Sequence, residues 1–175
     1  MLDHCRLAPL TAAYALADIP PQNRLPEMGF TLYMEDFGLE RLRAWFARPN
    51  SGLPPECAEA ARMLDFKDVQ GFLSGFIDMV YQDSDGLVCI IDYKSNHLGN
   101  NAEAYTPQAM NEAMAHHHYY LQALIYAIAV ARYYALRRRP LLRIAVRYLF
   151  LRGLDGGENG VWSWNIDTAD LTEWL

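Results

Sequence analysis

The chain has 175 residues, 52% of them hydrophobic and 21% charged, and a formal net charge of −6 at pH 7. This composition excludes a disordered or collagen-like chain, and the length fits a single domain that buries roughly two thirds of its surface. The negative charge argues against a protein that holds nucleic acid by bulk electrostatics alone, although it allows an enzyme to which other chains deliver DNA.

Cysteines and apolar runs indicate the compartment. Cys5, Cys57 and Cys89 are an odd number and lack the spacing of zinc ligands, so we expect neither disulfides nor a zinc site. No apolar run approaches the roughly 20 residues of a membrane span, and the opening MLDHCRLAPL lacks the features of a signal peptide. We therefore expect a cytoplasmic protein without a membrane contact.

The N-terminal part of the chain predicts both helices and strands. Residues 2–21 resemble the end of a helix followed by a turn, so we expect residues 1–175 to be one domain of a longer, N-terminally truncated chain. Residues 28–34, MGFTLYM, are rich in strand formers, whereas residues 38–48 carry apolar side chains at helical spacing. Proline and glycine then predict a loop, and residues 56–66 fit a short helix or a further loop.

Residues 75–96, GFIDMVYQDSDGLVCIIDYKSN, contain two apolar runs that predict two strands. The intervening SDG suits a three-residue hairpin loop with Gly86 in the left-handed conformation. In such a loop Asp83 pairs with Leu87, which fixes the register of the two strands. A β-bulge would shift this register by one residue.

This register gathers three charged side chains on one face of the hairpin. Counting back from the loop places Asp78 opposite Asp92, at about 5 Å. Lys94 points the same way and Tyr93 the other way, because side chains alternate along a strand. Two carboxylates this close repel each other, which raises the pKa of one of them or recruits a cation. A hard ion such as Mg²⁺ fits, since it takes a few carboxylate oxygens and keeps water in its other positions.

Lys94 restricts the reactions that this cluster could catalyse. An ammonium group beside a metal ion is repelled unless it serves an anion, such as a scissile phosphate or an attacking hydroxide. That combination is typical of metal-assisted phosphodiester hydrolysis. The spacing alone equally allows a salt-bridge cluster of Asp78, Lys94 and Asp92 on a solvated face of the sheet, and both interpretations stay open on this evidence.

Residues 106–138 predict one long helix. Thr106 is a suitable N-cap with Pro107 in the first turn, and the basic run 137–139 complements the helix dipole before Pro140 ends the helix. The basic run could also contact phosphate, but capping explains it without DNA. Apolar residues at helical spacing predict the buried face: Met110, Met114, Leu121, Ile125 and Ile128.

Polar side chains occupy a neighbouring stripe of this helix. Gln122 and Tyr126 are four residues apart and share the stripe with His118, whereas His116 and His117 point elsewhere. Because consecutive helix positions point about 100° apart, the three histidines cannot converge on one ion. We keep only His118, as a candidate substrate contact.

The C-terminal part completes a sheet. Residues 142–153 predict a central strand and residues 160–166 a final one. Residues 167–175 begin with a capping signal and predict a terminal helix. Together the elements predict an α/β fold, a mixed sheet of four to five strands flanked by helices, with the charged cluster on the hairpin.

Asp78, a hairpin and then Asp92-Tyr93-Lys94 resemble the core motif of the PD-(D/E)XK nuclease superfamily. This motif alone is short and unspecific. The words GFIDMV, IIDYKSN, YLFLRG and AYTPQAM resemble more specifically the RecB-type nuclease domains of bacterial exodeoxyribonuclease V, over about residues 25–164. The resemblance implies a restriction-endonuclease-like fold and Mg²⁺-dependent hydrolysis of DNA.

The roles of the family's residues carry over by this resemblance. Asp78, Asp92 and the main-chain carbonyl of Tyr93 would hold Mg²⁺, and Mn²⁺ or Ca²⁺ could take the same place. Lys94 would activate the attacking water and stabilise the transition state. Glu27, in PEMGF, lies where the family has a glutamate on an earlier strand, so it is a candidate further ligand. A strand-end carboxylate in water is the alternative for Glu27.

The resemblance also implies substrate contacts and partners. Gln122 and Tyr126 match the family's Q-x-x-x-Y element and would position the DNA backbone or a water molecule. The family further uses a histidine on a helix upstream of the first strand, and His4 does not match it, so we expect this fragment to be weakly active. The implied partners are DNA, RecC- and RecD-like subunits, and a helicase region of the same chain.

Other functions stay possible for such a fold. It can persist as a catalytically inactive scaffold that binds DNA or partner proteins, and a resolvase or restriction-type endonuclease is the enzymatic alternative. The facing carboxylates argue against a scaffold, because an inactive protein gains nothing from like charges at close range. We therefore predict a metal-dependent deoxyribonuclease, the nuclease module of a helicase-nuclease in double-strand break repair and recombination.

Overall fold

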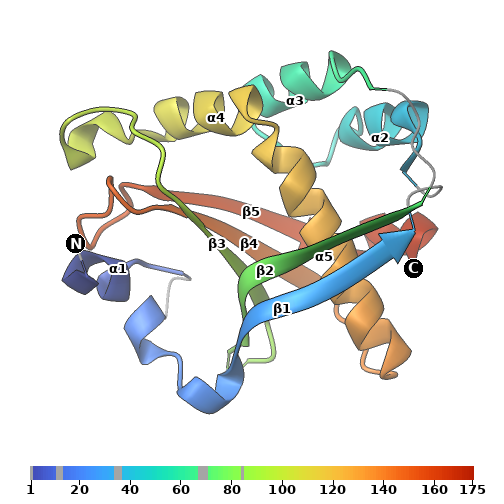
Figure 1. The fold of residues 1–175 in the computed structure, drawn as a ribbon, viewed down its shortest axis with the longest axis horizontal. Helices are drawn as coiled ribbons and strands as arrows, with labels where there is room; N and C mark the ends of the chain where they lie inside the picture. The colour runs from blue at the N-terminus through green and yellow to red at the C-terminus, as the bar shows by residue number, and fades with distance from the viewer. Residues whose placement is uncertain (1, 11–13, 34–36, 67–70, 84) are drawn as a thin grey trace.

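The structure is a computed structural model that describes residues 2–10, 14–33, 37–66, 71–83 and 85–175. Its centre is a five-stranded mixed sheet in the order β1-β2-β3-β4-β5 (Figure 1). The strands are β1 (Arg24–Tyr33), β2 (Phe72–Gln82), β3 (Val88–Lys94), β4 (Arg143–Phe150) and β5 (Val161–Asp167). The helices are α1 (Leu2–Leu7), α2 (Leu39–Phe46), α3 (Pro55–Arg62), α4 (Pro107–His116) and α5 (Tyr119–Leu136), with short 3-10 helices η1 (Leu16–Asp18), η2 (Pro21–Asn23), η4 (Ala102–Ala104) and η5 (Thr168–Trp174).

Strand β3 lies in the middle of the sheet. It pairs antiparallel with β2 and parallel with β4, and the parallel connection carries α4 and α5, as such crossovers usually carry helices. Both faces of β3 are covered: Ile90 packs with the helices, and Ile91 packs under the segment that precedes β1. Burial on both faces explains why β3 is a continuous apolar run instead of an alternation.

Two separate apolar cores sandwich the sheet. The larger core lies between the sheet and the helices, with α5 crossing the strands (Figure 1). The smaller core lies on the other face, where Leu10 and Ile19 of the N-terminal segment cover Ala145 and Leu149 of β4. The predicted α/β class with four to five strands is therefore confirmed.

The hairpin register predicted from the SDG loop is confirmed. Met79 pairs with Ile91, and the Asp83 amide donates to the Leu87 carbonyl at 3.0 Å. Gly86 has a φ of 85°, the left-handed conformation that the loop requires. Residue 84 of the loop lies outside the described residues.

Strands β1 and β2 continue beyond the rest of the sheet. They pair from Arg24 with Tyr81 to Tyr33 with Phe72, with an interruption at Glu27 and Asp78, whereas β3 pairs with only residues 79–82 of β2. Residues 28–33 and 72–77 therefore form a two-stranded extension, here called the β1–β2 arm. In Figure 1 the arm runs past α5 toward α2.

The single helix predicted over residues 106–138 is wrong. Thr106 does cap α4 through a hydrogen bond from the Ala109 amide, but α4 ends at His116 and α5 begins at Tyr119. Between them His118 adopts a left-handed conformation with a φ of 53°. A left-handed residue cannot continue a right-handed helix, so the chain changes direction there.

Other boundaries differ less. The first strand begins at Arg24, four residues before the predicted residue 28, and the ambiguous residues 56–66 contain α3, Pro55–Arg62. The terminal helix is a 3-10 helix, Thr168–Trp174. Within the described ranges, no helix combines the length and apolarity needed to cross a bilayer.

Candidate active site

Asp92 and Lys94 lie at the end of β3, on the face that α5 covers. Asp92 is only 4% exposed and stands beside Tyr148 of β4 in the parallel register. Its Oδ2 lies 2.7 Å from Lys94 Nζ. The side chains of both residues are almost completely enclosed, so the alternative of a salt bridge on a solvated face does not describe this pair.

The Lys94 ammonium is fixed from several sides. It donates a hydrogen bond to Gln122 Oε1 at 3.0 Å. It also lies 3.9 Å from the centre of the Tyr119 ring and 5.0 Å from that of Tyr148. Aromatic faces attract cations, so Lys94 is held in place even without its contact to Asp92.

The Gln122 amide has its orientation fixed by its partners. Its Oε1 accepts from the Tyr148 hydroxyl at 2.9 Å as well as from Lys94. Its Nε2 donates to the Tyr126 hydroxyl at 2.9 Å, and that hydroxyl donates to the Phe76 carbonyl at 3.2 Å. The expected stripe of Gln122 and Tyr126 is thus confirmed, and the pair connects α5 to strands β2 and β3.

Asp78 lies across the hairpin, at the point where the ladder between β2 and β3 stops. Its side chain is exposed, and its Oδ2 accepts a hydrogen bond from the Tyr93 amide at 2.8 Å. Lys94 directs its carbonyl to Leu151 after β4. Because consecutive residues of a strand turn their main-chain groups to opposite sides, the Tyr93 carbonyl faces the β2 side together with Asp78.

Burial disfavours the charged form of the Asp92 carboxyl. Burial raises the pKa of the Asp92 carboxyl, the Lys94 ammonium lowers it in part, and the Asp78 charge raises it again. Asp92 Oδ2 is buried, and the Lys94 ammonium lies 2.7 Å from it. A buried carboxylate oxygen in this state costs stability.

The phenols around the cluster stay protonated. Burial, followed by the charges of Asp92 and Asp78, raises the pKa of Tyr126 to about 12. Burial is also the main reason that the pKa of Tyr148 lies well above its ordinary value. Both hydroxyls therefore serve as hydrogen-bond donors at neutral pH.

The donors of the cluster suit a small hard cation. Two carboxylates and one carbonyl are the oxygen ligands that Mg²⁺ takes while it keeps several waters, and the Asp92 oxygen that would join them already faces a cation, the Lys94 ammonium. Among the described residues, no group of three or more His, Cys, Asp or Glu side chains converges on one point. An ion here would therefore depend on Asp78, Asp92, the Tyr93 carbonyl and water.

Glu27 is close in register but is not gathered into the cluster. It lies between Pro26 and Met28, which pair with Met79 and Ile77, so it stands opposite Asp78. Its side chain is exposed and its φ is 49°. A left-handed conformation of a residue other than glycine costs about 1 kcal/mol or more and often marks a functional site.

His118 does not lie where the sequence predicts. It precedes α5 instead of sharing the helical stripe of Gln122. Its Nδ1 lies 3.0 Å from the Tyr120 hydroxyl, and the Tyr120 ring packs against Phe46 of α2. The predicted position on the stripe is wrong, and nothing in the geometry supports a substrate contact by His118.

Two residues of the site are missed by the sequence. Tyr119 and Tyr148 enclose the Lys94 ammonium, and their rings lie 6.0 Å apart in a stacked arrangement. Tyr148 sits in an apolar strand in which a tyrosine looks like ordinary core. Its role depends on the parallel register between β3 and β4, for which the sequence contains no local signal.

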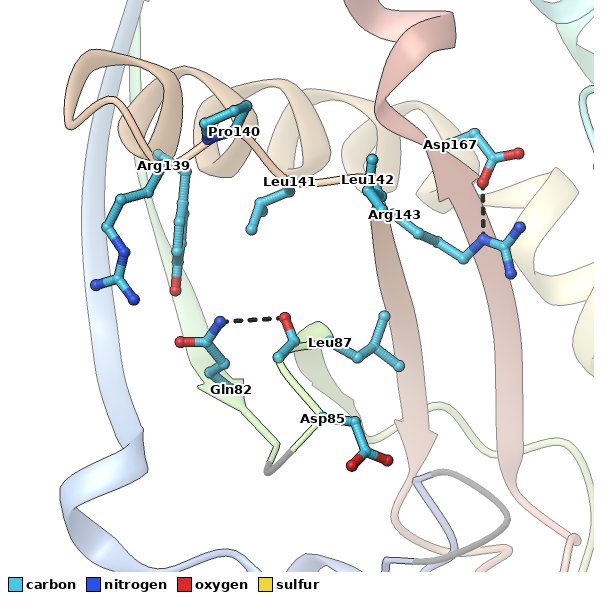
Figure 2. A pocket seen from close by; sticks show the side chains of 11 residues that line it. Gln82, Asp85, Leu87, Arg139, Pro140, Leu141, Leu142, Arg143 and Asp167 are labelled. Carbon is cyan, nitrogen blue, oxygen red and sulfur yellow. Dashed lines mark hydrogen bonds and ion pairs between the residues drawn. The ribbon is translucent and has the colours of Figure 1, made fainter.

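A cavity of about 730 Å³ lies at the other end of the hairpin, near its loop. Gln82 and Leu87 line it together with Arg139 and Arg143, as Figure 2 shows. Gln82 Nε2 donates to the Gly86 carbonyl at 3.1 Å, and Arg143 forms an ion pair with Asp167 at 2.7 Å. The lining of this cavity includes no residue of the Asp92 cluster, so the cavity is separate from that cluster.

Comparison with known proteins defines the class. A family model described as the PD-(D/E)XK nuclease superfamily matches residues 7–171. The chain therefore belongs to this superfamily, and its five-stranded mixed sheet flanked by helices is consistent with a restriction-endonuclease-like fold.

The curated relatives that this chain matches are RecB subunits. The chain is 38% identical to the RecBCD enzyme subunit RecB of Escherichia coli K12, over 85% of this chain and 12% of the relative. It is 32% identical to RecB of Mycobacterium tuberculosis CDC 1551, over 93% of this chain and 17% of the relative. It is 35% identical to RecB of Haemophilus influenzae, over 81% of this chain and 12% of the relative. The chain thus spans less than a fifth of the length of these relatives.

Proposed function

We propose that this chain is the nuclease module of a RecBCD-type enzyme and hydrolyses DNA phosphodiesters with a divalent metal ion. The observation that carries the proposal is Asp92. Its carboxylate is buried and ionisable, and it is paired at 2.7 Å with a lysine that a polar network also fixes. Such a costly arrangement is expected where a site is prepared for a charged ligand.

The oxygen donors have the metal-binding role. Asp78, Asp92 and the Tyr93 carbonyl would hold Mg²⁺, with Mn²⁺ or Ca²⁺ able to replace it. When bound, the ion supplies Lewis acidity and lowers the pKa of a water molecule. Glu27 stands opposite Asp78 and could reach the ion through water.

Lys94 has the role of the electrostatic catalyst. Its ammonium orients the attacking water and stabilises the charge that develops on the phosphate. Gln122 and the two aromatic rings hold it at the site. It therefore remains in place when Asp92 turns to another cation. Gln122 and Tyr126 thus act through Lys94, and we propose this in place of a direct contact with the DNA backbone.

We propose the substrate and the partner subunits from the names of the relatives. The relatives are RecB subunits of RecBCD enzymes, so we propose DNA as the substrate. The proposed partners are RecC- and RecD-like subunits and a helicase region of the same chain. The role that follows is double-strand break repair and recombination. The net charge of −6 supports such delivery of DNA by other chains.

An inactive scaffold is the second candidate, and a cleavage assay separates the two. Linear and plasmid DNA are incubated with Mg²⁺ or Mn²⁺ and the wild-type chain, Asp92→Ala or Asp83→Ala, each with a chelator control. We expect slow, metal-dependent cleavage by the wild type and by Asp83→Ala, and none by Asp92→Ala. Cleavage that persists in Asp92→Ala contradicts the proposed site. DNA binding without cleavage by the folded wild type favours the scaffold.

A further inference from the structure

Lys94 is the last residue of β3, so the chain leaves the sheet directly after the lysine that we assign to catalysis. The ladder between β3 and β4 ends with the pair of Lys94 and Phe150, and the Leu151 amide beyond it donates to the Lys94 carbonyl at 2.9 Å. The ends of helices and strands open more easily than their centres. The contacts of the residues that follow therefore decide how firmly the main chain of Lys94 is held.

Two side chains from distant segments bind the main chain beyond this strand end. Arg152 Nε donates a hydrogen bond to the Ser95 carbonyl at 3.0 Å. The Tyr105 hydroxyl donates to the Asn96 carbonyl at 3.1 Å and accepts from the Leu98 amide at 3.2 Å. Arg152 and Tyr105, here called the clamp, thus bind two consecutive carbonyls of a segment that forms neither helix nor strand.

Tyr105 is the rigid part of the clamp. Its side chain is fully buried, and the turn after β4 packs directly against its ring. A Cβ added to Gly153 would lie 2.2 Å from Tyr105 Cγ, so this close approach requires glycine. The Gly153 amide donates to the Phe150 carbonyl at 2.8 Å, which closes the turn. A ring enclosed in this way holds its hydroxyl at a fixed position.

The clamped segment also contacts a ring that holds the Lys94 side chain. Asn96 Oδ1 accepts a long hydrogen bond from the Tyr119 hydroxyl at 3.4 Å. The Lys94 ammonium lies 3.9 Å from the centre of the same ring. Lys94 is thus fixed through its own main chain and, by way of Tyr119, through the segment that follows it. A displacement of Asn96 would loosen both connections.

We propose that Arg152 and Tyr105 are positioning residues that hold Lys94 at the Asp92 site by binding the main chain after it. This rests on the proposed nuclease function, in which Lys94 acts as a preorganised charge that loses its effect when it is displaced. Loss of the clamp leaves the carboxylates of Asp78 and Asp92 in place and lowers turnover. Because Tyr105 is fully buried, its effect on DNA cleavage is indirect.

The acylation rate of Lys94 tests the clamp without DNA. The chain has two lysines, Lys67 and Lys94, so mass spectrometry assigns the label directly. The Lys94 side chain is 11% exposed and should react slowly with acetic anhydride in the metal-free chain. Tyr105→Phe and Arg152→Met remove the donors of the clamp, and each should raise this rate roughly fivefold, the scale of one lost hydrogen bond. The control Tyr81→Phe removes another buried hydroxyl of the sheet and changes nothing.

Cleavage kinetics complete the test. Tyr105→Phe should lower kcat and leave KM for DNA unchanged, and Arg152→Lys, which keeps a donor, should restore much of the kcat that Arg152→Met loses. All rates are measured well below the melting temperatures, where a merely structural role leaves them unchanged. Unchanged acylation of Lys94 in both clamp variants overturns the positioning role, and so does faster acylation with an unchanged kcat. If the wild-type chain does not cleave DNA, the nuclease proposal fails and the acylation rates alone decide whether the clamp holds Lys94.

Discussion

The two ends of the β2–β3 hairpin each carry aspartates, but in opposite states. At the loop, Asp83 Oδ1 accepts hydrogen bonds from the amides of Asp85 and Leu87 at 3.0 and 2.8 Å. At the other end, Asp92 Oδ2 is buried against the Lys94 ammonium at 2.7 Å, and burial raises the pKa of its carboxyl. The first aspartate stabilises a turn, whereas the second costs stability.

This difference separates structure from function within one hairpin. A turn aspartate needs only nearby amides, which the loop supplies from its own main chain. Asp92 lies near the charge of Asp78, and its buried oxygen faces a cation, the Lys94 ammonium. A charged residue that destabilises the fold, at a position where an apolar side chain would fit, is best explained by a role in binding a ligand.

Among the predicted effects of substitutions, the loss of metal binding is expected to be the largest. Titration calorimetry of the wild-type chain with Mg²⁺ or Mn²⁺ should show weak binding, since only a few protein oxygens contribute. Asp78→Ala and Asp92→Ala each remove one of these ligands and should abolish it. Asp83→Ala serves as the control in the same hairpin. Undiminished binding in both site variants would mean that the ion, if any, lies elsewhere.

Lys94→Ala should reduce DNA cleavage about 10²-fold or more, the scale of losing one preorganised electrostatic group. Metal affinity should hold or rise, because a positive charge 2.7 Å from Asp92 Oδ2 has been removed. Cleavage rates at saturating metal and calorimetric affinities measure the two effects separately. A variant that loses metal affinity but cleaves normally at saturation would reduce Lys94 to an organiser of the site.

Asp92→Asn should raise the melting temperature of the metal-free chain at neutral pH. The pKa of Asp92 is raised in the fold from an ordinary 3.8, so the folded chain binds this proton more tightly than the unfolded chain does. Stability from this group is therefore greatest below that ordinary value and falls as pH rises through the raised pKa. Removing the charge should add on the order of 1 kcal/mol, or about 2–4 °C, at pH 7.

The pH dependence of the melting temperature provides the control for Asp92→Asn. The advantage of Asp92→Asn should disappear on acidification, where the wild-type carboxyl is already neutral. The exposed Asp155 has the opposite sign, since hydrogen bonds from the Gly157 amide and from Asn159 lower its pKa, so Asp155→Asn should lower the melting temperature at neutral pH. A clear loss of stability in Asp92→Asn at pH 7 would instead support a structural salt bridge.

Asp83→Ala should have the smallest effect, a destabilisation of about 1 kcal/mol or less. It removes two hydrogen bonds to loop amides that water can partly replace. Denaturant unfolding measures the loss, and cleavage per folded molecule should be unchanged. A loss of cleavage that exceeds the loss of folded protein would show that the two ends of the hairpin are coupled.

The sequence predicts the hairpin well because its signals are local. The glycine of the loop fixes the register as far as Met79 and Ile91, and the two-residue strand period puts Lys94 on the face of Asp92. The contact between Asp92 and Tyr148 could not be predicted in this way, because a parallel register joins distant segments without a local pattern. The left-handed conformation of His118 is not predicted for a different reason: no glycine or proline among residues 108–136 marks a break in the helix.

The central claim is that Asp78 and Asp92 together hold a divalent ion, and a crystal structure of this chain grown with Mn²⁺ tests it most directly. We predict one anomalous peak between the two carboxylates, with the Tyr93 carbonyl turned toward it and Lys94 still bonded to Gln122. A well-ordered site without such a peak, in which Lys94 remains paired with Asp92, would contradict the account.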